Sequence, residues 1–264
     1  MEFKSLGLRT DMIFHRFSAQ VEDRGDYVVI RTPSRPDYFW GNCLIMQSAP
    51  HMGDLDRWIA AFEREIGPRT QTGFMTFAWD DPSGAVGEMA PFLEFGFTQS
   101  TSNILTTSEL VRPAVYNAAL TVRRLESEDD WDQHIDVQFS DDWAYGTAED
   151  QRRFVTGQRD MLRDMVRAGL GLRFGAFLEN RLIGDLGIYW DRDVARFNNV
   201  ATRTSDRRKG ACSTLVYEAS RYILQNTPCK TLVLEAVAGA PAARLYETLG
   251  FKPVQRLCKI EWMA

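Results

Sequence analysis

The stretch from Arg207 to Gly210 carries the residues of this chain best suited to hold a phosphate. It reads Arg-Arg-Lys-Gly, follows an apolar run typical of a strand (195–202) and precedes a helical pattern over 213–225. The first backbone N–H groups of a helix have no partner inside it, and the helix dipole favours an anion there. Gly210 has no Cβ, so the chain can approach a ligand closely. We therefore predict a pyrophosphate site made by Arg207, Arg208, Lys209, Gly210, Ala211, Cys212 and Ser213.

A second motif lies downstream, where residues 242–251 read Ala-Ala-Arg-Leu-Tyr-Glu-Thr-Leu-Gly-Phe. Neither common nucleotide loop is present, because the sequence holds no G-x-x-x-x-G-K-[ST] and no G-x-G-x-x-G after a strand. The chain has instead Arg-x-x-Gly-x-small at Arg207, Gly210 and Cys212, followed by a helix, a strand (231–237) and the segment around Tyr246. In this order, the two motifs resemble the acetyl-CoA site of the GNAT superfamily of N-acyltransferases.

The resemblance implies acetyl-CoA as cosubstrate, since the R/Q-x-x-G-x-G/A turn of that family holds the pyrophosphate of coenzyme A. It also implies that a splayed strand, here Val200, Ala201 and Thr202, bonds the pantetheine arm through backbone groups. One of these amides would serve as an oxyanion donor. The family's tyrosine beside the thiol corresponds to Tyr246, which we expect to protonate the leaving thiolate as general acid.

The general base is not marked by any motif. We favour Glu235, while Asp185 or a chain of water molecules would serve as alternatives. Asp141, Asp142, Trp143 and Tyr145 would border an acceptor pocket in this fold, or else cap a helix and fill a core. Asn198 and Asn199 are either substrate contacts or plain strand residues.

The chain departs from the family pattern at three places. Cys212 stands where glycine or alanine is usual, and its size favours a packing role over that of a nucleophile. Gly239 and Ala240 occupy the region where an asparagine commonly contacts the cofactor. Thr204 replaces a usual proline, and we expect little consequence.

The elements that must position these residues can be read from the pattern of apolar positions. Strands are expected over 120–125, 173–178, 182–190, 195–202 and 231–237, helices over 128–139, 148–168, 213–225 and 241–249, and one or two strands over 251–262. This order resembles a complete GNAT domain, which we predict at 119–264.

The first 115 residues resemble a degenerate copy of the same plan. Strands are expected over 26–32, 42–47 and 73–79, with an amphipathic helix over 54–66. The pair Gly96-Phe97 precedes Gly250-Phe251 by 154 residues, about one domain length. The turn over 48–53 lacks the Arg-x-x-Gly cluster, and Phe92 stands in the tyrosine position. We therefore predict an α/β fold (α+β mixed sheet) with two GNAT-like domains in tandem, 1–115 without a cofactor loop and 119–264 catalytic, joined by a linker over 106–117.

Composition restricts the function classes further. The 264 residues suffice for two modest domains, and a net charge of −5 argues against a nucleic-acid-binding surface. The sequence shows neither an apolar run of membrane-spanning length nor a secretory segment in its first eleven residues. The four cysteines are scattered without C-x-x-C pairing. We expect a cytoplasmic protein that requires no metal and has no nucleic-acid or membrane partner.

Together these observations predict an acetyl-CoA-dependent N-acetyltransferase. It would move an acetyl group to a primary amine of a small-molecule or peptide acceptor, by direct attack in a ternary complex. The alternative is a CoA-binding sensor or scaffold protein without turnover. The internal duplication is compatible with a monomer that is itself a pseudo-dimer, or with a homodimer.

Overall fold

The computed structural model describes residues 2–139 and 146–264. The chain forms two compact units whose segments alternate along the sequence. The first unit comprises Met1–Leu105, Glu235–Ala240 and Pro253–Ala264, and the second comprises Thr106–Leu234 and Pro241–Lys252. The domains predicted at 1–115 and 119–264 are continuous segments defined by the sequence repeat. Their boundaries stay a prediction.

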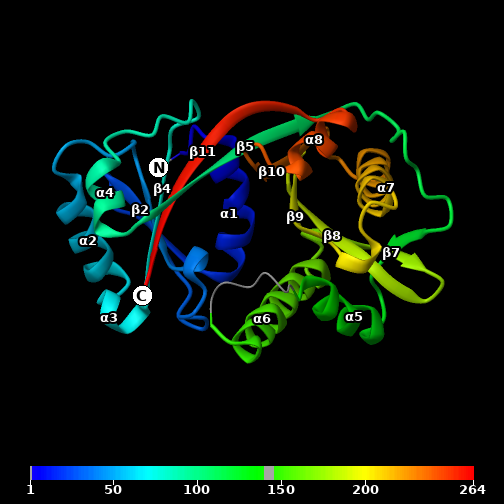
Figure 1. Cartoon of the computed structure of the whole chain (residues 1–264), viewed down its shortest axis with the longest axis horizontal. Helices are drawn as coiled ribbons and strands as arrows, with labels where there is room; N and C mark the ends of the chain where they lie inside the picture. The colour runs from blue at the N-terminus through cyan, green and yellow to red at the C-terminus, as the bar shows by residue number, and fades with distance from the viewer. Residues whose placement is uncertain (1, 140–145) are drawn as a thin grey trace. The chain divides into compact units, whose positions relative to one another are not determined.

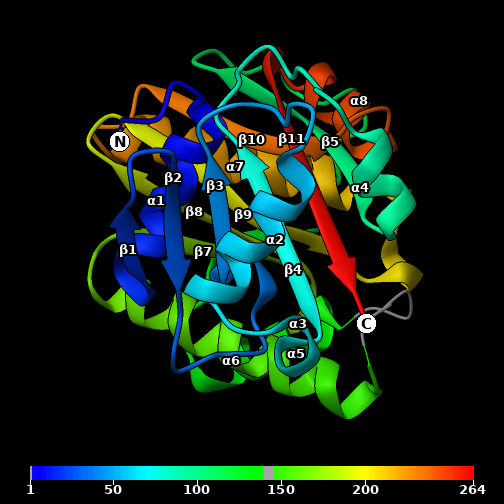
Figure 2. The same cartoon turned by 90° about the vertical axis from the view of Figure 1, so that its left-hand side faces the viewer.

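In the first unit a mixed sheet is covered by helices on both faces (Figures 1 and 2). Its strands run in the order β1-β2-β3-β4-β11, with β3 and β4 parallel and the other neighbours antiparallel. Helices α2, α3 and α4 lie on one face and α1 on the other. The elements are α1 (Leu6–Ser18), β1 (Gln20–Asp23), β2 (Tyr27–Arg31), β3 (Cys43–Met46), α2 (Asp54–Glu65), α3 (Arg69–Thr72), β4 (Phe74–Trp79), α4 (Ala90–Phe95), β5 (Thr98–Thr107) and β11 (Lys252–Met263).

Aromatic side chains fill the core of this unit. Trp58 of α2 lies between Phe77 of β4 and Phe92 of α4, with ring centroids 5.4 and 5.2 Å away. Phe92 is only 1% exposed and also packs edge-on against Phe97. Burying aromatic rings of this size supplies much of the stability of a small core. The residue in the tyrosine position of the first half is therefore a core residue.

In the second unit the strands run in the order β10-β9-β8-β7-β6. The strands β6 to β9 are antiparallel neighbours, and β9 pairs in parallel with β10. Helices α5 and α6 cover one face and α7 the other (Figure 1). The elements are β6 (Thr121–Arg124), α5 (Glu128–Gln138), α6 (Ala148–Arg167), β7 (Gly171–Leu178), β8 (Arg181–Asp191), β9 (Val194–Thr202), α7 (Ala211–Asn226), β10 (Thr231–Val237) and α8 (Pro241–Thr248). The predicted α/β mixed-sheet fold is confirmed.

The two halves of the chain repeat one local pattern. Each has a strand, a helix, a second strand parallel to the first and a second helix, which are β3-α2-β4-α4 and β9-α7-β10-α8. Each first helix is preceded by a left-handed glycine, Gly53 with φ 83° and Gly210 with φ 75°. Each second helix is followed by another left-handed glycine, Gly96 with φ 107° and Gly250 with φ 99°. Glycine adopts this conformation without the steric cost of a Cβ, so the repeat is visible in backbone geometry as well as in sequence.

Candidate active site

The start of α7 is open to an anion. Gly210 precedes the helix and no side chain caps it, whereas α5 and α6 begin with complete capping boxes. The first helical backbone hydrogen bond of α7 runs from Thr214 N to Gly210 O at 3.0 Å. The N–H groups of Ala211, Cys212 and Ser213 therefore precede the first helical hydrogen bond, and a phosphate can accept from them.

The basic turn ahead of α7 is held by one buried carboxylate. Asp206 bonds the guanidinium of Arg181 at 2.9 and 3.2 Å, and Arg181 is the main cause that lowers the pKa of Asp206. The Nζ of Lys209 lies 3.6 Å from the same carboxylate. Arg208 has a left-handed φ of 61°, and Arg207 donates through Nε to the Thr202 carbonyl at 3.2 Å. Part of the turn's positive charge is thus neutralised locally, and Arg207 is the cation of the turn that bonds the strand end.

Residues 109–117, within the segment predicted as a linker, form a strap against both sequence motifs. The carbonyl of Val115 accepts from Ser213 Oγ at 3.1 Å. A Cβ added at Gly210 would lie 2.8 Å from the same carbonyl oxygen. At the other motif, Val111 N donates to Leu249 O at 3.0 Å. The strap therefore fixes the end of α8 and the start of α7.

The end of β9 separates from β10. Their pairing runs from Val194 to Arg196, and a register shift against β8 between Asp185 and Gly187 leaves a bulge in β9. Asn199 lies in this bulge with a left-handed φ of 47°. The last residues of β9 still pair with β8, and on the β10 side they lie beside an open space.

This open space is a cavity of about 800 Å³ within the second unit. Of the predicted site residues it brings together Val200, Ala201, Thr202, Arg207, Cys212 and Tyr246. Arg208, Lys209, Gly210, Ala211 and Ser213 form the adjoining turn and helix start without lining the cavity, and Glu235 does not line it. Among the residues that the structure describes, its lining is Asp136, Val137, Gln138, Phe139, Val200, Ala201, Thr202, Arg203, Thr204, Ser205, Arg207, Cys212, Pro241, Ala242 and Tyr246.

Tyr246 and Cys212 are both neutral in this cavity. Burial, followed by the neighbouring Cys212, raises the pKa of Tyr246, which is 5% exposed. The phenol therefore holds its proton and can donate a hydrogen bond to a sulfur that gains negative charge. Burial also raises the pKa of Cys212 to about 11. Because a thiolate is the reactive form, this agrees with a packing role for Cys212.

The two carboxylates considered as bases have other partners. Glu235 accepts from Lys259 Nζ at 2.7 Å in the first unit. Asp185 is fully buried; burial alone would raise its pKa, but the charge of Arg173 and the contact with His134 lower it to about 2. Asp185 is therefore an ionised structural group, and its role as an alternative base is not supported.

The sequence analysis did not identify the wall contributed by α5. Asp136, Gln138 and Phe139 line the cavity at the end of this helix. The Asp136 side chain is 53% exposed and lies 3.6 Å from Arg152. Their only signal in the sequence is their position at the end of the predicted helix over 128–139, and that signal is weak. Of the other predicted rim residues, Asp141, Asp142, Trp143 and Tyr145 lie outside the described residues.

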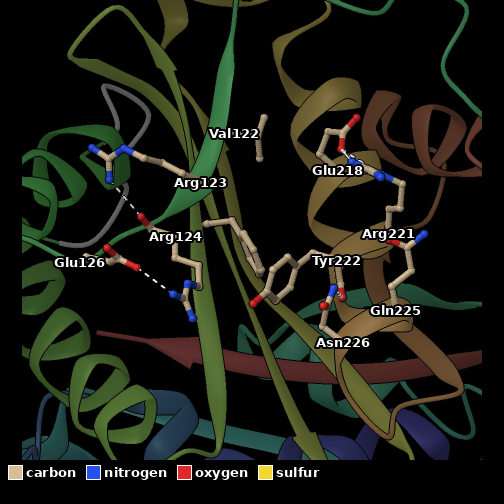
Figure 3. A pocket seen from close by; sticks show the side chains of 10 residues that line it. Val122, Arg123, Arg124, Glu126, Glu218, Arg221, Tyr222, Gln225 and Asn226 are labelled. Atoms are coloured by element: carbon tan, nitrogen blue, oxygen red, sulfur yellow. Dashed lines mark hydrogen bonds and ion pairs between the residues drawn. The ribbon is translucent and has the colours of Figure 1, made fainter.

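A smaller cavity of about 330 Å³ lies between α7 and β6 (Figure 3). Within 2–139 and 146–264, it shares no lining residue with the larger one. Arg124 is paired with Glu126 at 2.9 Å and Arg221 with Glu218 at 2.6 Å. Tyr222 packs edge-on against Phe174. Because each cation faces its own carboxylate, this cavity lacks the excess positive charge that a pyrophosphate requires.

The corresponding helix in the first unit, α2, carries acidic residues in its first turn, whereas α7 has none there. The Asp54 carboxylate, in the first turn of α2, accepts the backbone N–H of His51 at 2.9 Å and pairs with Arg57 at 2.9 Å. Although its partial burial opposes ionisation, these two partners lower the pKa of Asp54. A carboxylate paired with Arg57 therefore lies in the first turn of α2, where α7 has no acidic residue.

Comparison with known proteins identifies the region that holds the larger cavity. Residues 130–251 match the model of the acetyltransferase (GNAT) family. This region is a GNAT domain. No curated protein matches the sequence.

Solved structures show the same fold over nearly the whole chain. A functionally unknown conserved protein from Staphylococcus epidermidis has a TM-score of 0.75 at 12% identity, covering 94% of this chain and 95% of its own. A GCN5-related N-acetyltransferase from Kribbella flavida has a TM-score of 0.65 at 14% identity, covering 98% and 96%. A tandem GNAT protein from the clavulanic acid biosynthesis pathway has a TM-score of 0.55 at 13% identity, covering 97% and 87%. The chain therefore has a tandem GNAT fold.

Two further features bear on ligands and location. Among residues 2–139 and 146–264, no three His, Cys, Asp or Glu side chains are grouped so that they could hold a metal ion. None of the helices that the structure describes is long and apolar enough to cross a membrane.

Proposed function

We propose that the second unit transfers an acetyl group from acetyl-CoA to a primary amine of a small-molecule or peptide acceptor, by direct attack in a ternary complex. One observation carries this proposal: a single cavity joins the end of β9 on its β10 side, Arg207 and Cys212 at the start of α7, and Tyr246. The open helix start suits the pyrophosphate, and the edge of β9 that β10 leaves open suits an amide-bearing arm that adds like a strand.

The proposed reaction moves the acetyl group directly from the sulfur of coenzyme A to the nitrogen of the amine. The amine nitrogen bonds to the acetyl carbon while the carbon–sulfur bond breaks, and the thiolate leaves with the electron pair. Tyr246 gives the leaving sulfur its proton. Backbone N–H groups of Val200 to Thr202 stabilise the charge that develops on the carbonyl oxygen.

An ammonium acceptor must lose two protons: the first leaves before the amine attacks, and the second leaves as the amide forms and passes through water to restore the Tyr246 phenol. Among the described residues that line the cavity, Asp136 is the one carboxylate. It is partly exposed, so it can attract an ammonium group from solvent and accept its proton, directly or through water. Asp136 therefore replaces Glu235 as our favoured base.

The test combines an amine screen with one substitution. Purified protein is mixed with acetyl-CoA and a panel of amines, and the release of free thiol is followed. Tyr246→Phe should lower kcat while acetyl-CoA affinity, measured by calorimetry, stays the same. Tyr222→Phe, which alters the smaller cavity, is the matched control and should change neither quantity.

Three outcomes separate the hypotheses. Acetyl-CoA binding with turnover that depends on Tyr246 supports the enzyme. Binding without turnover of any amine overturns the enzyme in favour of a sensor or scaffold. Absence of acetyl-CoA binding at millimolar concentration by folded protein overturns both.

A further inference from the structure

A buried polar cluster lies beneath the bulge of β9. We call it the Asp185 cluster: Asp185 of β8, Arg173 of β7, and His134 and Gln138 of α5. Asp185 is 0% exposed, and Arg173 and His134 are each 1% exposed. The carboxylate accepts from Arg173 Nη2 at 2.9 Å and from Gln138 Nε2 at 2.5 Å, and it bonds His134 Nδ1. Each charge in the cluster therefore faces an opposite charge or a hydrogen-bond partner.

Two members of the cluster also reach the backbone of the bulge. Gln138 Nε2 donates to the Asn199 carbonyl at 3.0 Å, and Arg173 Nη2 donates to the same oxygen at 3.3 Å. Asn199 has the left-handed φ of 47°, a conformation that a non-glycine residue keeps only when its surroundings hold it. The cluster is thus part of what holds the bulge in place.

The orientation of this carbonyl determines that of the next amide. In a planar trans peptide, the carbonyl of one residue and the N–H of the next point in opposite directions. With the Asn199 carbonyl directed into the Asp185 cluster, the N–H of Val200 is directed away from it, and Val200 lines the cavity. A carbonyl that accepts from a cation also polarises its peptide group, which makes that N–H a stronger donor.

Stability alone gives a weak reason for the cluster. A buried ion pair is often no more stabilising than apolar side chains of similar size, because both charges lose their hydration. The same volume between α5 and β7 could be filled by aliphatic residues. The contact with Asn199 is what aliphatic residues could not supply.

We propose that the Asp185 cluster is a positioning device, which aims and polarises the Val200 N–H as the donor to the carbonyl oxygen of the acetyl thioester. The inference rests on the proposed function. Gln138, Arg173 and Asp185 act through Asn199 and are positioning residues.

The test removes one donor to Asn199 and reads out the thioester carbonyl itself. Gln138→Leu leaves Arg173 and Asp185 in place. Gln133→Leu is the matched control, since Gln133 lies on the same helix and is equally half-buried. It donates to Asn180 O at 3.3 Å and accepts from Leu182 N at 2.8 Å, and neither partner is in the cavity lining. Acetyl-CoA labelled with ¹³C at the carbonyl is bound to each protein, and its carbonyl stretch is measured by infrared difference spectroscopy.

In the parent protein and in Gln133→Leu, the bound carbonyl should absorb at lower frequency than free acetyl-CoA, because it accepts a hydrogen bond. In Gln138→Leu this shift should shrink, and kcat should fall about tenfold with little change in acetyl-CoA affinity, as expected for loss of one hydrogen bond behind the donor. Equal shifts in both variants would overturn the inference while the proposed function stands. If the parent protein binds no acetyl-CoA, the proposed function itself fails.

Discussion

The side-chain amide of Asn117 donates a 2.9 Å hydrogen bond to the carbonyl oxygen of Lys209. Its backbone N–H donates to Thr214 Oγ1 at 2.9 Å. Asn117 therefore bridges the basic turn that contains Lys209 and the first helical turn of α7. By the same planar-peptide argument, fixing the Lys209 carbonyl fixes the direction of the Gly210 N–H at the predicted phosphate site.

Asn117→Ala should weaken acetyl-CoA binding about five- to tenfold, which corresponds to loss of one hydrogen bond worth about 1 kcal/mol. Calorimetry with acetyl-CoA measures the change. Asn226→Ala is the matched control, because the Asn226 amide also donates to a backbone carbonyl, that of Tyr222 at 2.8 Å, at the far end of α7. Equal affinities for the two variants would contradict a role of the strap in ligand binding.

Gly210→Ala should reduce both stability and acetyl-CoA binding. The left-handed φ of 75° disfavours alanine, and the added Cβ would lie 2.8 Å from the Val115 carbonyl. Gly169→Ala has the same φ of 75° with nothing within 4 Å of the added Cβ, so it should show only the conformational cost of about 1 kcal/mol. Urea unfolding and calorimetry compare the two. If Gly169→Ala is equally harmful, the close contact with the strap has no special role.

Asp136→Asn should lower kcat about a hundredfold and leave acetyl-CoA affinity unchanged, since loss of a general base costs a rate factor of this order. Steady-state rates with the best amine of the screen give the result. Glu235→Gln provides the comparison between the two candidate bases. A large loss of kcat in Glu235→Gln with none in Asp136→Asn would restore the base predicted from sequence.

Acidification below neutral pH should destabilise the protein. Burial, together with the charge of Lys259, lowers the pKa of His15 to about 4, and burial together with Arg173 lowers the pKa of His134. The unfolded chain takes up these protons near pH 6.5, so unfolding binds protons in this range. For His15 the free energy of unfolding should then fall by up to about 1.4 kcal/mol per pH unit between about pH 6.5 and about pH 4. Urea unfolding over this range measures the slope, which His15→Gln should make shallower.

Sequence patterns predicted the elements around the site better than those at the beginning of the chain. The strand over 231–237 agrees residue for residue, and α7, α8 and β9 agree within two residues at each end. Their apolar positions are regular, and Pro241 and Gly250 mark helix limits. The helix α1 was missed because small or polar Gly7 and Thr10 belong to its buried face, which interrupts the apolar period.

The candidate site was predictable only where it depends on local motifs. The turn at Arg207 and the helix of Tyr246 have their own sequence patterns, and both border the cavity. Gln138 and Arg173 are ordinary polar residues whose role depends on contacts 61 and 26 residues away in sequence. Such contacts follow from tertiary packing and leave no local signal.

The Asp54 carboxylate bears on how many acetyl-CoA molecules one chain should bind. Since the first turn of α2 carries an acidic residue, we expect the nucleotide to bind at α7 and not at α2. Binding isotherms of one isolated chain should therefore be hyperbolic, with one equivalent at saturation. A sigmoidal isotherm would then indicate association between separate chains, whereas two equivalents per chain would contradict this expectation.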